Sequence, residues 1–131
     1  MKLALDTNAY VAMCHDEKRA IEYVSAADEI FIPFIVIAEL RAGFAHGNQA
    51  RRNERYLQQF LGAKRVGVLF ADEETTHHYA HLFCQLRQAG TPIPTNDLWI
   101  ACLALQHELS LLSFDAHFDK IPQLLRVGRL S

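Results

Sequence analysis

The stretch GTPIPTNDLWIACLAL, Gly90 to Leu105, indicates a helix that is buried inside a domain. Pro92 and Pro94 favour an extended approach, and the hydroxyl of Thr95 and the amide of Asn96 can cap the first helical turn. We therefore expect a helix that begins near Asn96. Its almost unbroken apolar sequence suits the interior rather than the surface of a domain.

Asp97 is the exception in this apolar helix. A carboxylate in the first turn interacts favourably with the helix dipole, so a structural first-turn acid is one interpretation. The other is that a carboxylate at the start of a buried helix is held rigidly and directed into a cleft. Both interpretations fit this stretch by itself.

The length and composition predict one compact domain over residues 1–131. The chain has 131 residues, of which 50% are hydrophobic, enough for a core without disulfides. Its start, MKLALDTN, has only a short apolar run, and no apolar run in the chain reaches the length of a membrane span. We therefore expect a cytoplasmic protein without a signal peptide or a membrane segment.

The charge and cysteine content exclude two kinds of protein. The formal net charge is −2, so nucleic-acid binding through a global basic excess is excluded and any such contact needs a local patch. The three cysteines, Cys14, Cys84 and Cys102, are widely spaced and have apolar neighbours. They predict buried thiols rather than a disulfide framework or a zinc knuckle.

Apolar runs separated by breaker residues predict an α/β fold, with a central, mainly parallel β-sheet flanked by helices on both faces. The strands are expected at residues 2–5, 29–32, 66–70 and 110–114, with an edge strand within 121–130. The helices are expected at residues 9–13, 16–27, 34–42, 49–61 and 72–89 and from Asn96, with a turn at 43–48. The connections are short, and no repeat or linker interrupts them.

Four acids occupy comparable places in this order of elements. Asp6 and Asp115 each follow a predicted strand, while Glu39 and Asp97 lie in apolar helices that come after a proline. The carboxyl ends of parallel strands share one edge of an open α/β sheet, so we expect the four carboxylates to converge on one cleft. Structural roles remain open, with Asp6 or Asn8 as the N-cap of the first helix and Glu39 paired with Arg41 or another arginine.

Converging carboxylates repel one another unless a cation joins them. Hard oxygen ligands without clustered cysteine or histidine favour Mg²⁺ or Mn²⁺ over zinc. An ion of this kind can polarise a phosphodiester and lower the pKa of a bound water. The predicted chemistry is therefore metal-assisted phosphodiester hydrolysis.

Three arginines, Arg51, Arg52 and Arg55, lie near the start of an amphipathic helix. They form the densest basic patch of the sequence. Either they contact the phosphate groups of a nucleic acid or they form an ordinary solvated helix face.

Four motifs, in this order, resemble the successive motifs of the PIN-domain ribonucleases and, more narrowly, of the VapC toxins of type II toxin–antitoxin pairs. They are DTN at Asp6–Asn8, AELRAG at Ala38–Gly43, GTPIPTNDLWIA at Gly90–Ala101 and LLSFDAHF at Leu111–Phe118. No single motif is specific, but together they span nearly the whole chain.

The resemblance implies a PIN-like fold and a metal-dependent endoribonuclease. Asp6, Glu39 and Asp97 match the acids that hold Mg²⁺, for which Mn²⁺ can substitute, and Asp115 matches a fourth, more variable acid. Supporting positions are matched by Thr7, Asn8, Asn96 and Ser113. The serine in this set replaces the family's usual threonine and keeps the hydroxyl. Asp119 is a nearby acid that could share the role of Asp115.

The resemblance also implies partners and products. The substrate is RNA, with transfer RNA among the candidates, and attack by water leaves a 5′-phosphate and a 3′-hydroxyl. The arginine patch would then guide the RNA backbone. A homodimer is expected, together with a VapB-type antitoxin whose carboxyl-terminal segment occludes the site. Aromatic side chains around Phe44, Tyr56 and Phe60 either receive that segment or pack within the domain.

Three other kinds of protein share some of these features. A receiver-like signalling domain also gathers acids at strand ends, but the nearest lysine after the last strand, Lys120, lies in a poor context. A zinc protein could use Glu73, His77 and His81, which are spaced four residues apart, although no second cluster completes the site. A PIN-like module that binds metal and RNA without cleaving remains the most serious alternative.

Overall fold

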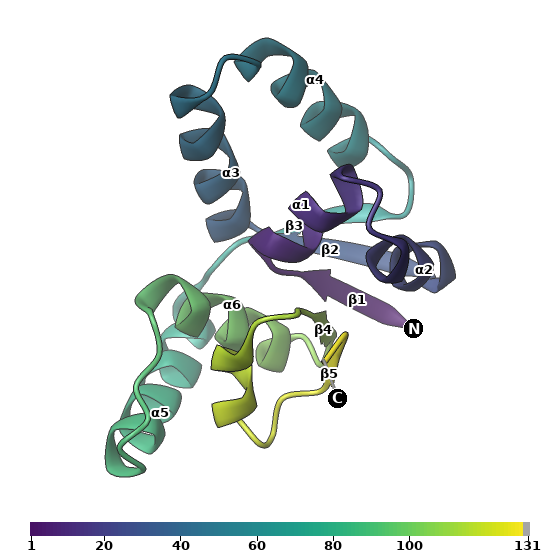
Figure 1. Cartoon of the computed structure of the whole chain (residues 1–131). Helices are drawn as coiled ribbons and strands as arrows, with labels where there is room; N and C mark the ends of the chain where they lie inside the picture. The colour runs from purple at the N-terminus through teal and green to yellow at the C-terminus, as the bar shows by residue number, and fades with distance from the viewer. Residues whose placement is uncertain (130–131) are drawn as a thin grey trace.

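Parallel strands form the centre of the computed structural model, which describes residues 1–129 (Figure 1). The strands are β1 Lys2–Leu5, β2 Glu29–Pro33, β3 Val66–Leu69, β4 Ser110–Leu112 and β5 Arg126–Val127. They form one five-stranded sheet in the order β3-β2-β1-β4-β5, and every neighbouring pair is parallel. The predicted parallel α/β fold is confirmed. The predicted edge strand is β5, and Leu130, the last residue of that prediction, lies outside the described residues.

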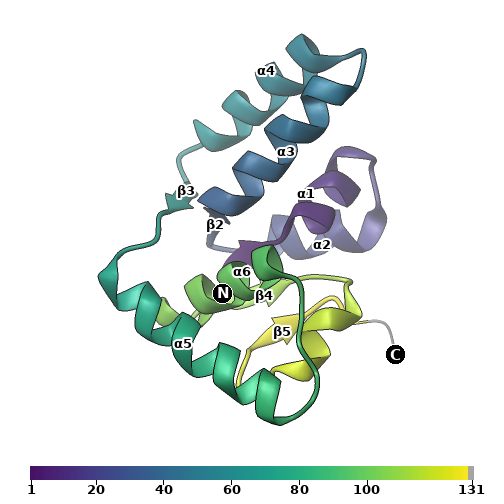
Figure 2. The same cartoon turned by 90° about the vertical axis from the view of Figure 1, so that its left-hand side faces the viewer.

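Helices cover both faces of this sheet. Their bounds are α1 Thr7–Cys14, α2 Lys18–Ala26, α3 Phe34–His46, α4 Ala50–Leu61, α5 Glu73–Gln88 and α6 Thr95–Gln106, with a 3₁₀ helix, η1, at Ala116–Lys120. Connections between parallel strands are right-handed, and the chain moves in one direction from β1 to β3 but in the opposite direction from β3 to β4. Helices α1 to α4 therefore lie on one face and α5 and α6 on the other (Figures 1 and 2).

The core lies between the sheet and these helices. Leu3 and Leu5 of β1 and Ile30 of β2 have no exposed surface, and Ile100 and Leu103 of α6 are equally buried. Burial of each such side chain stabilises the fold by about 1.5–3 kcal/mol. Helix α6 is apolar because half of its side chains are buried in this core. In the described part of the chain, no helix combines the length and the apolar character that crossing a membrane requires.

Helix α3 is longer than predicted. The turn expected from residue 43 begins only after His46, and the helix passes through Gly43. Phe44 packs against the core. The burial of this aromatic side chain outweighs the penalty of about 1 kcal/mol for one glycine inside a helix. The helix ends at Gly47, which is its C-cap.

The predicted caps of α6 were wrong. The helix begins at Thr95, and Pro94 is the N-cap, without any side-chain capping hydrogen bond. The Pro94 carbonyl accepts the Leu98 N–H at 3.0 Å. Thr95 and Asn96 are therefore exposed first-turn residues, and Asp97 follows them in the same turn.

The prediction of three buried thiols was right only for Cys102. Cys14, the last residue of α1, and Cys84, on α5, are exposed, and all three thiols are free. Apolar neighbours in a sequence do not settle burial in a helix, because successive residues point in different directions around its axis.

Candidate active site

The site lies where the sheet reverses its strand order. The connection that leaves β1 leads towards β2 and β3, whereas β4 pairs with the other side of β1. The carboxyl ends of β1 and β4 therefore form a topological switch point, the usual ligand site of an open α/β sheet. Asp6 directly follows β1, and Ser113 directly follows β4.

Asp6 is a helix cap and a site residue at the same time. Its Oδ1 accepts the Ala9 N–H at 2.8 Å, which caps α1, and its Oδ2 accepts the Ser113 hydroxyl at 2.5 Å. Only 4% of Asp6 is exposed. Burial, with smaller contributions from the charges of Asp97 and Asp115, raises the pKa of Asp6 from 3.8 to about 6 against the opposing hydrogen bonds.

Asp97 and Asp115 meet across the side chain of His117. The His117 Nδ1 lies 2.8 Å from Asp97 Oδ2 and 3.2 Å from Asp115 Oδ1. Asp115 is the N-cap of η1 and accepts the His117 N–H at 2.9 Å. Burial raises the pKa of Asp97, and the nearby charges of Asp115 and Glu39 raise it further, while His117 opposes the shift.

Glu39 projects from α3 and is half-buried. Its Oε1 accepts the Thr7 hydroxyl at 2.7 Å. The arginine partner considered for Glu39 is engaged elsewhere, because Arg41 forms a two-pronged hydrogen bond with Glu54 at 2.9 and 3.0 Å. The hydrogen-bond partner of Glu39, which the sequence did not determine, is therefore Thr7.

The supporting residues predicted from the sequence differ in how far they are buried. Ser113 is fully buried, Thr7 is half-buried, and Asn8 and Asn96 are exposed. The arginines Arg51, Arg52 and Arg55 are exposed on α4 and line shallow grooves near the α3–α4 turn, to which none of the four acids contributes.

Asp119 is separate from the acids of the site. It forms ion pairs with Arg126 and Arg129, the second at 3.2 Å. The carboxyl group is thus neutralised by arginines at the end of the described chain.

The residues of the zinc interpretation do not assemble. Within residues 1–129, one group of three possible metal-ligating side chains has its ligand atoms within 4.8 Å of one another, and it consists of Asp97, Asp115 and His117. His77 and His81 are exposed on α5. His117 was not among the predicted site residues, although its place two residues after a strand-ending acid could have marked it.

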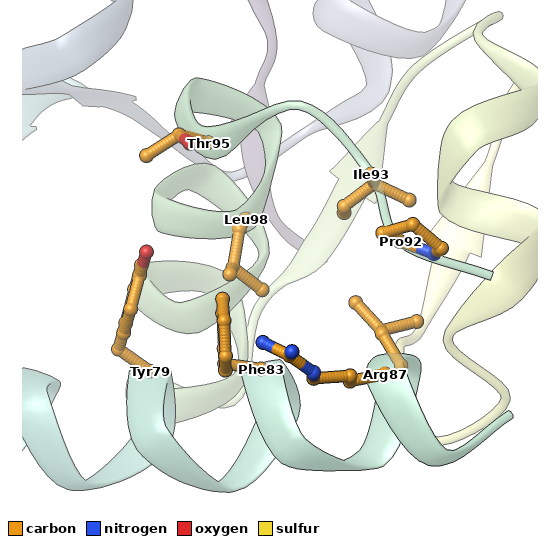
Figure 3. Close-up of a pocket in the computed structure, with 8 residues that line it drawn as sticks. Tyr79, Phe83, Arg87, Pro92, Ile93, Thr95 and Leu98 are labelled. Carbon is orange, nitrogen blue, oxygen red and sulfur yellow. The ribbon is translucent and has the colours of Figure 1, made fainter. Parts of the chain in front are cut away.

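An aromatic pocket of about 240 Å³ lies between α5 and the start of α6 with the segment that precedes it (Figure 3). Tyr79, Phe83 and Arg87 of α5 line one wall, and Tyr79 also stacks on Trp99 with ring centroids 4.3 Å apart. Thr95, two residues before Asp97, lines the pocket, but no acidic side chain does. The pocket is therefore a neighbour of the acidic site and not a part of it.

Comparison with known proteins identifies the class to which this fold and site belong. A family model of the PIN domain matches residues 3–124, so the chain belongs to the PIN-domain family. Within that family it is similar to Ribonuclease VapC1 of Haemophilus influenzae (strain R2866), with 33% identity over 125 residues and 92% of each chain covered. The resemblance predicted from the four motifs is confirmed.

Solved structures agree with this assignment. VapBC-1 from nontypeable Haemophilus influenzae contains a chain with a TM-score of 0.83 and 31% identity, covering 96% of each chain. VapBC2 from Rickettsia felis, bound to a DNA fragment from its promoter, contains one with a TM-score of 0.82 and 28% identity, covering 96% of this chain and 97% of that chain.

Proposed function

We propose that this protein is a metal-dependent endoribonuclease that acts as the toxin of a VapBC-type toxin–antitoxin pair. The observation that carries the proposal is that four carboxylates, from four different segments of a PIN domain, lie near enough to one another for the charges of Asp115 and Asp97 to raise the pKa of Asp6 and for those of Asp115 and Glu39 to raise the pKa of Asp97. The relatives named Ribonuclease VapC support the activity, and the solved VapBC complexes support the toxin role.

The donor set fits a divalent cation. The raised pKa values of Asp6 and Asp97 express the cost of burying negative charges near one another, and a cation would relieve that cost. Carboxylate oxygens are the ligands that Mg²⁺ and Mn²⁺ prefer. We propose that Mg²⁺, or Mn²⁺ in its place, is held by Asp6, Glu39, Asp97 and Asp115.

The chain's own residues would position the ion and the substrate. Ser113 and the α1 backbone fix Asp6, and Thr7 fixes Glu39, so two of the carboxylates are held before any ion arrives. A divalent cation supplies Lewis-acid polarisation of the phosphodiester. The side chains of Asn8 and Asn96 are exposed and lie close in sequence to Asp6 and Asp97, and in this proposal they would contact RNA.

The reaction is hydrolysis. The oxygen of a water molecule forms a bond to phosphorus, and the bond from phosphorus to the 3′-oxygen breaks. The water molecule gives up one proton, and the 3′-oxygen takes up one proton. The products are a 5′-phosphate and a 3′-hydroxyl. RNA, with transfer RNA as the first candidate, is the proposed substrate, and the cytoplasm is the proposed place of action. The phosphate backbone of the RNA would be contacted by Arg51, Arg52 and Arg55.

We place the antitoxin segment in a groove of about 320 Å³ between α1 and the α3–α4 pair. Phe44 and the half-exposed Tyr56 line this groove, as does Arg52. Phe60 instead packs edge-on against Tyr10, with ring centroids 5.5 Å apart. An apolar segment with an acidic residue would suit the groove, and Tyr56→Asp should weaken co-purification with a VapB-type partner. We also propose a homodimer, which sedimentation of the isolated protein tests.

The decisive experiment uses antitoxin-free protein, total RNA and isolated transfer RNA, in Mg²⁺, in Mn²⁺ or in EDTA. We expect discrete fragments that need a metal ion and disappear with Asp97→Asn. Asp16→Asn is the matched control, because Asp16 is exposed and is not one of the predicted site residues. Absence of cleavage in every metal, with Mn²⁺ still bound in calorimetry, would favour a silent binding module instead.

A further inference from the structure

We infer that His117 is a nitrogen ligand of the metal ion in this site and gives the site a preference for Mn²⁺ over Mg²⁺. The inference rests on the proposed function, because it adds one ligand to the proposed carboxylate site. It concerns the only histidine of the described chain that contacts two of the four acids.

The separations of the three ligand atoms match those of a coordination shell. Neighbouring ligands of an octahedral ion at about 2.1 Å lie about 3.0 Å apart. The His117 Nδ1 lies 2.8 Å from Asp97 Oδ2 and 3.2 Å from Asp115 Oδ1, on either side of that value. An ion can therefore meet all three atoms with only small side-chain movements.

The local sequence holds the imidazole in this place. Asp115 caps η1 through the backbone N–H of His117, at 2.9 Å, and the Asp115 N–H in turn donates to the Ser113 hydroxyl at 3.0 Å. Ser113 then donates to Asp6. One hydrogen-bonded chain thus runs from Asp6 to His117, and the imidazole meets Asp97 at its far end.

The His117 side chain is half-exposed and is not packed in the core, so its ring can act as a ligand of a metal ion. Without an ion, the contact with the Asp97 carboxylate requires a proton on Nδ1. Coordination through Nδ1 requires instead the neutral ring with its proton on Nε2, which leaves a lone pair on Nδ1. Mg²⁺ is a hard cation that takes oxygen ligands, whereas Mn²⁺ belongs to the first-row transition metals, whose ions accept imidazole nitrogen more readily. Replacing one oxygen ligand by this nitrogen therefore favours Mn²⁺.

The test is pulsed electron paramagnetic resonance of tag-free protein loaded with one equivalent of Mn²⁺, in a buffer without coordinating amines. We expect ¹⁴N modulation of the Mn²⁺ signal, and we expect it to vanish in His117→Gln. Calorimetry should show Mn²⁺ affinity about tenfold weaker in that variant, with Mg²⁺ affinity changed less than about twofold. His77→Gln, which removes an exposed histidine of α5, should change neither result.

The outcomes separate this inference from the proposed function. Failure of the wild-type protein to bind Mn²⁺ would overturn the metal site and the inference with it. Binding of Mn²⁺ without ¹⁴N modulation would leave the carboxylate site intact and overturn the role of His117. An equal loss of Mn²⁺ and Mg²⁺ affinity in His117→Gln, with an unchanged melting temperature, would show that His117 only positions Asp97 and Asp115.

Discussion

Replacement of Asp6 by asparagine should stabilise the metal-free protein. The carboxyl group is 4% exposed, and its pKa rises from 3.8 to about 6 on folding. Each factor of ten in proton affinity corresponds to about 1.4 kcal/mol, so the charged Asp6 destabilises the fold by about 3 kcal/mol at neutral pH. Asparagine removes this cost and still accepts the Ala9 N–H as an N-cap.

One hydrogen bond opposes the gain. Ser113 now donates to Asp6 and accepts the Asp115 N–H. With an asparagine amide facing it, the Ser113 hydroxyl loses an acceptor for its proton, which costs about 1 kcal/mol. The net stabilisation is therefore about 2 kcal/mol, or about 5–10 °C in melting temperature for a chain of this size.

The sign of the pH dependence is fixed by the direction of the pKa shift. Between pH 4 and pH 6 the folded wild-type protein binds more protons at Asp6 than the unfolded chain, so its stability falls as pH rises through this window. Asp6→Asn lacks this dependence. The advantage of the variant should therefore grow from pH 4 to pH 6 and stay constant above about pH 7.

Thermal and urea unfolding in EDTA, from pH 4 to pH 8, measure this difference. Asp16→Asn removes an exposed charge and should change the free energy of unfolding by less than about 0.5 kcal/mol. Adding Mn²⁺ should then raise the melting temperature of the wild-type protein but not of Asp6→Asn. An Asp6→Asn protein that melts below wild type at pH 7.5 in EDTA would refute the reasoning, because the hydrogen bond from Ser113 to the carboxylate would then stabilise the fold by more than burial of the charge costs.

Three further outcomes are expected. Gly43→Ala should raise the free energy of unfolding by about 0.5–1 kcal/mol in urea titrations, because a Cβ there meets no atom within 4 Å inside a helix. Ser113→Ala should lower it by about 1–3 kcal/mol, since buried Asp6 loses a donor; an unchanged urea midpoint would contradict the hydrogen bond. Alanine at all three exposed arginines of α4, in an Asp97→Asn background, should weaken RNA binding and flatten its salt dependence, and an unchanged salt slope would exclude them as phosphate contacts.

The sheet and the position of the acids were predictable because both depend on local patterns. The strands at residues 2–5 and 29–32 are short apolar runs bounded by an acid or a proline, and they form β1 and most of β2. Parallel pairing then brings their carboxyl ends to one edge, whichever helices connect them. Asp6 follows β1 and Asp115 lies just beyond β4, which pairs with β1, so these two acids come near each other, as the effect of the Asp115 charge on the pKa of Asp6 shows.

The features that were missed depend on contacts between distant segments. Gly43 signals a turn in the sequence, but the burial of Phe44 extends α3 through it. The exposure of Cys84 depends on which side of α5 faces α6, which no local pattern records. The contact between His117 and Asp97 forms because η1 packs beside α6, and the two residues are distant in sequence.

The hydrogen bonds of the four acids explain how the fold tolerates them. Asp6 is held by Ser113 and the start of α1, Glu39 by Thr7, and Asp97 and Asp115 by His117. These donors come from residues that follow β1 and β4, so the two strand ends that place Asp6 and Asp115 also place the donors to all four acids. A carboxylate has about four acceptor sites, and one or two protein donors leave others open for a cation. The same arrangement therefore limits repulsion before metal binding and preserves the oxygen ligands that the proposed reaction requires.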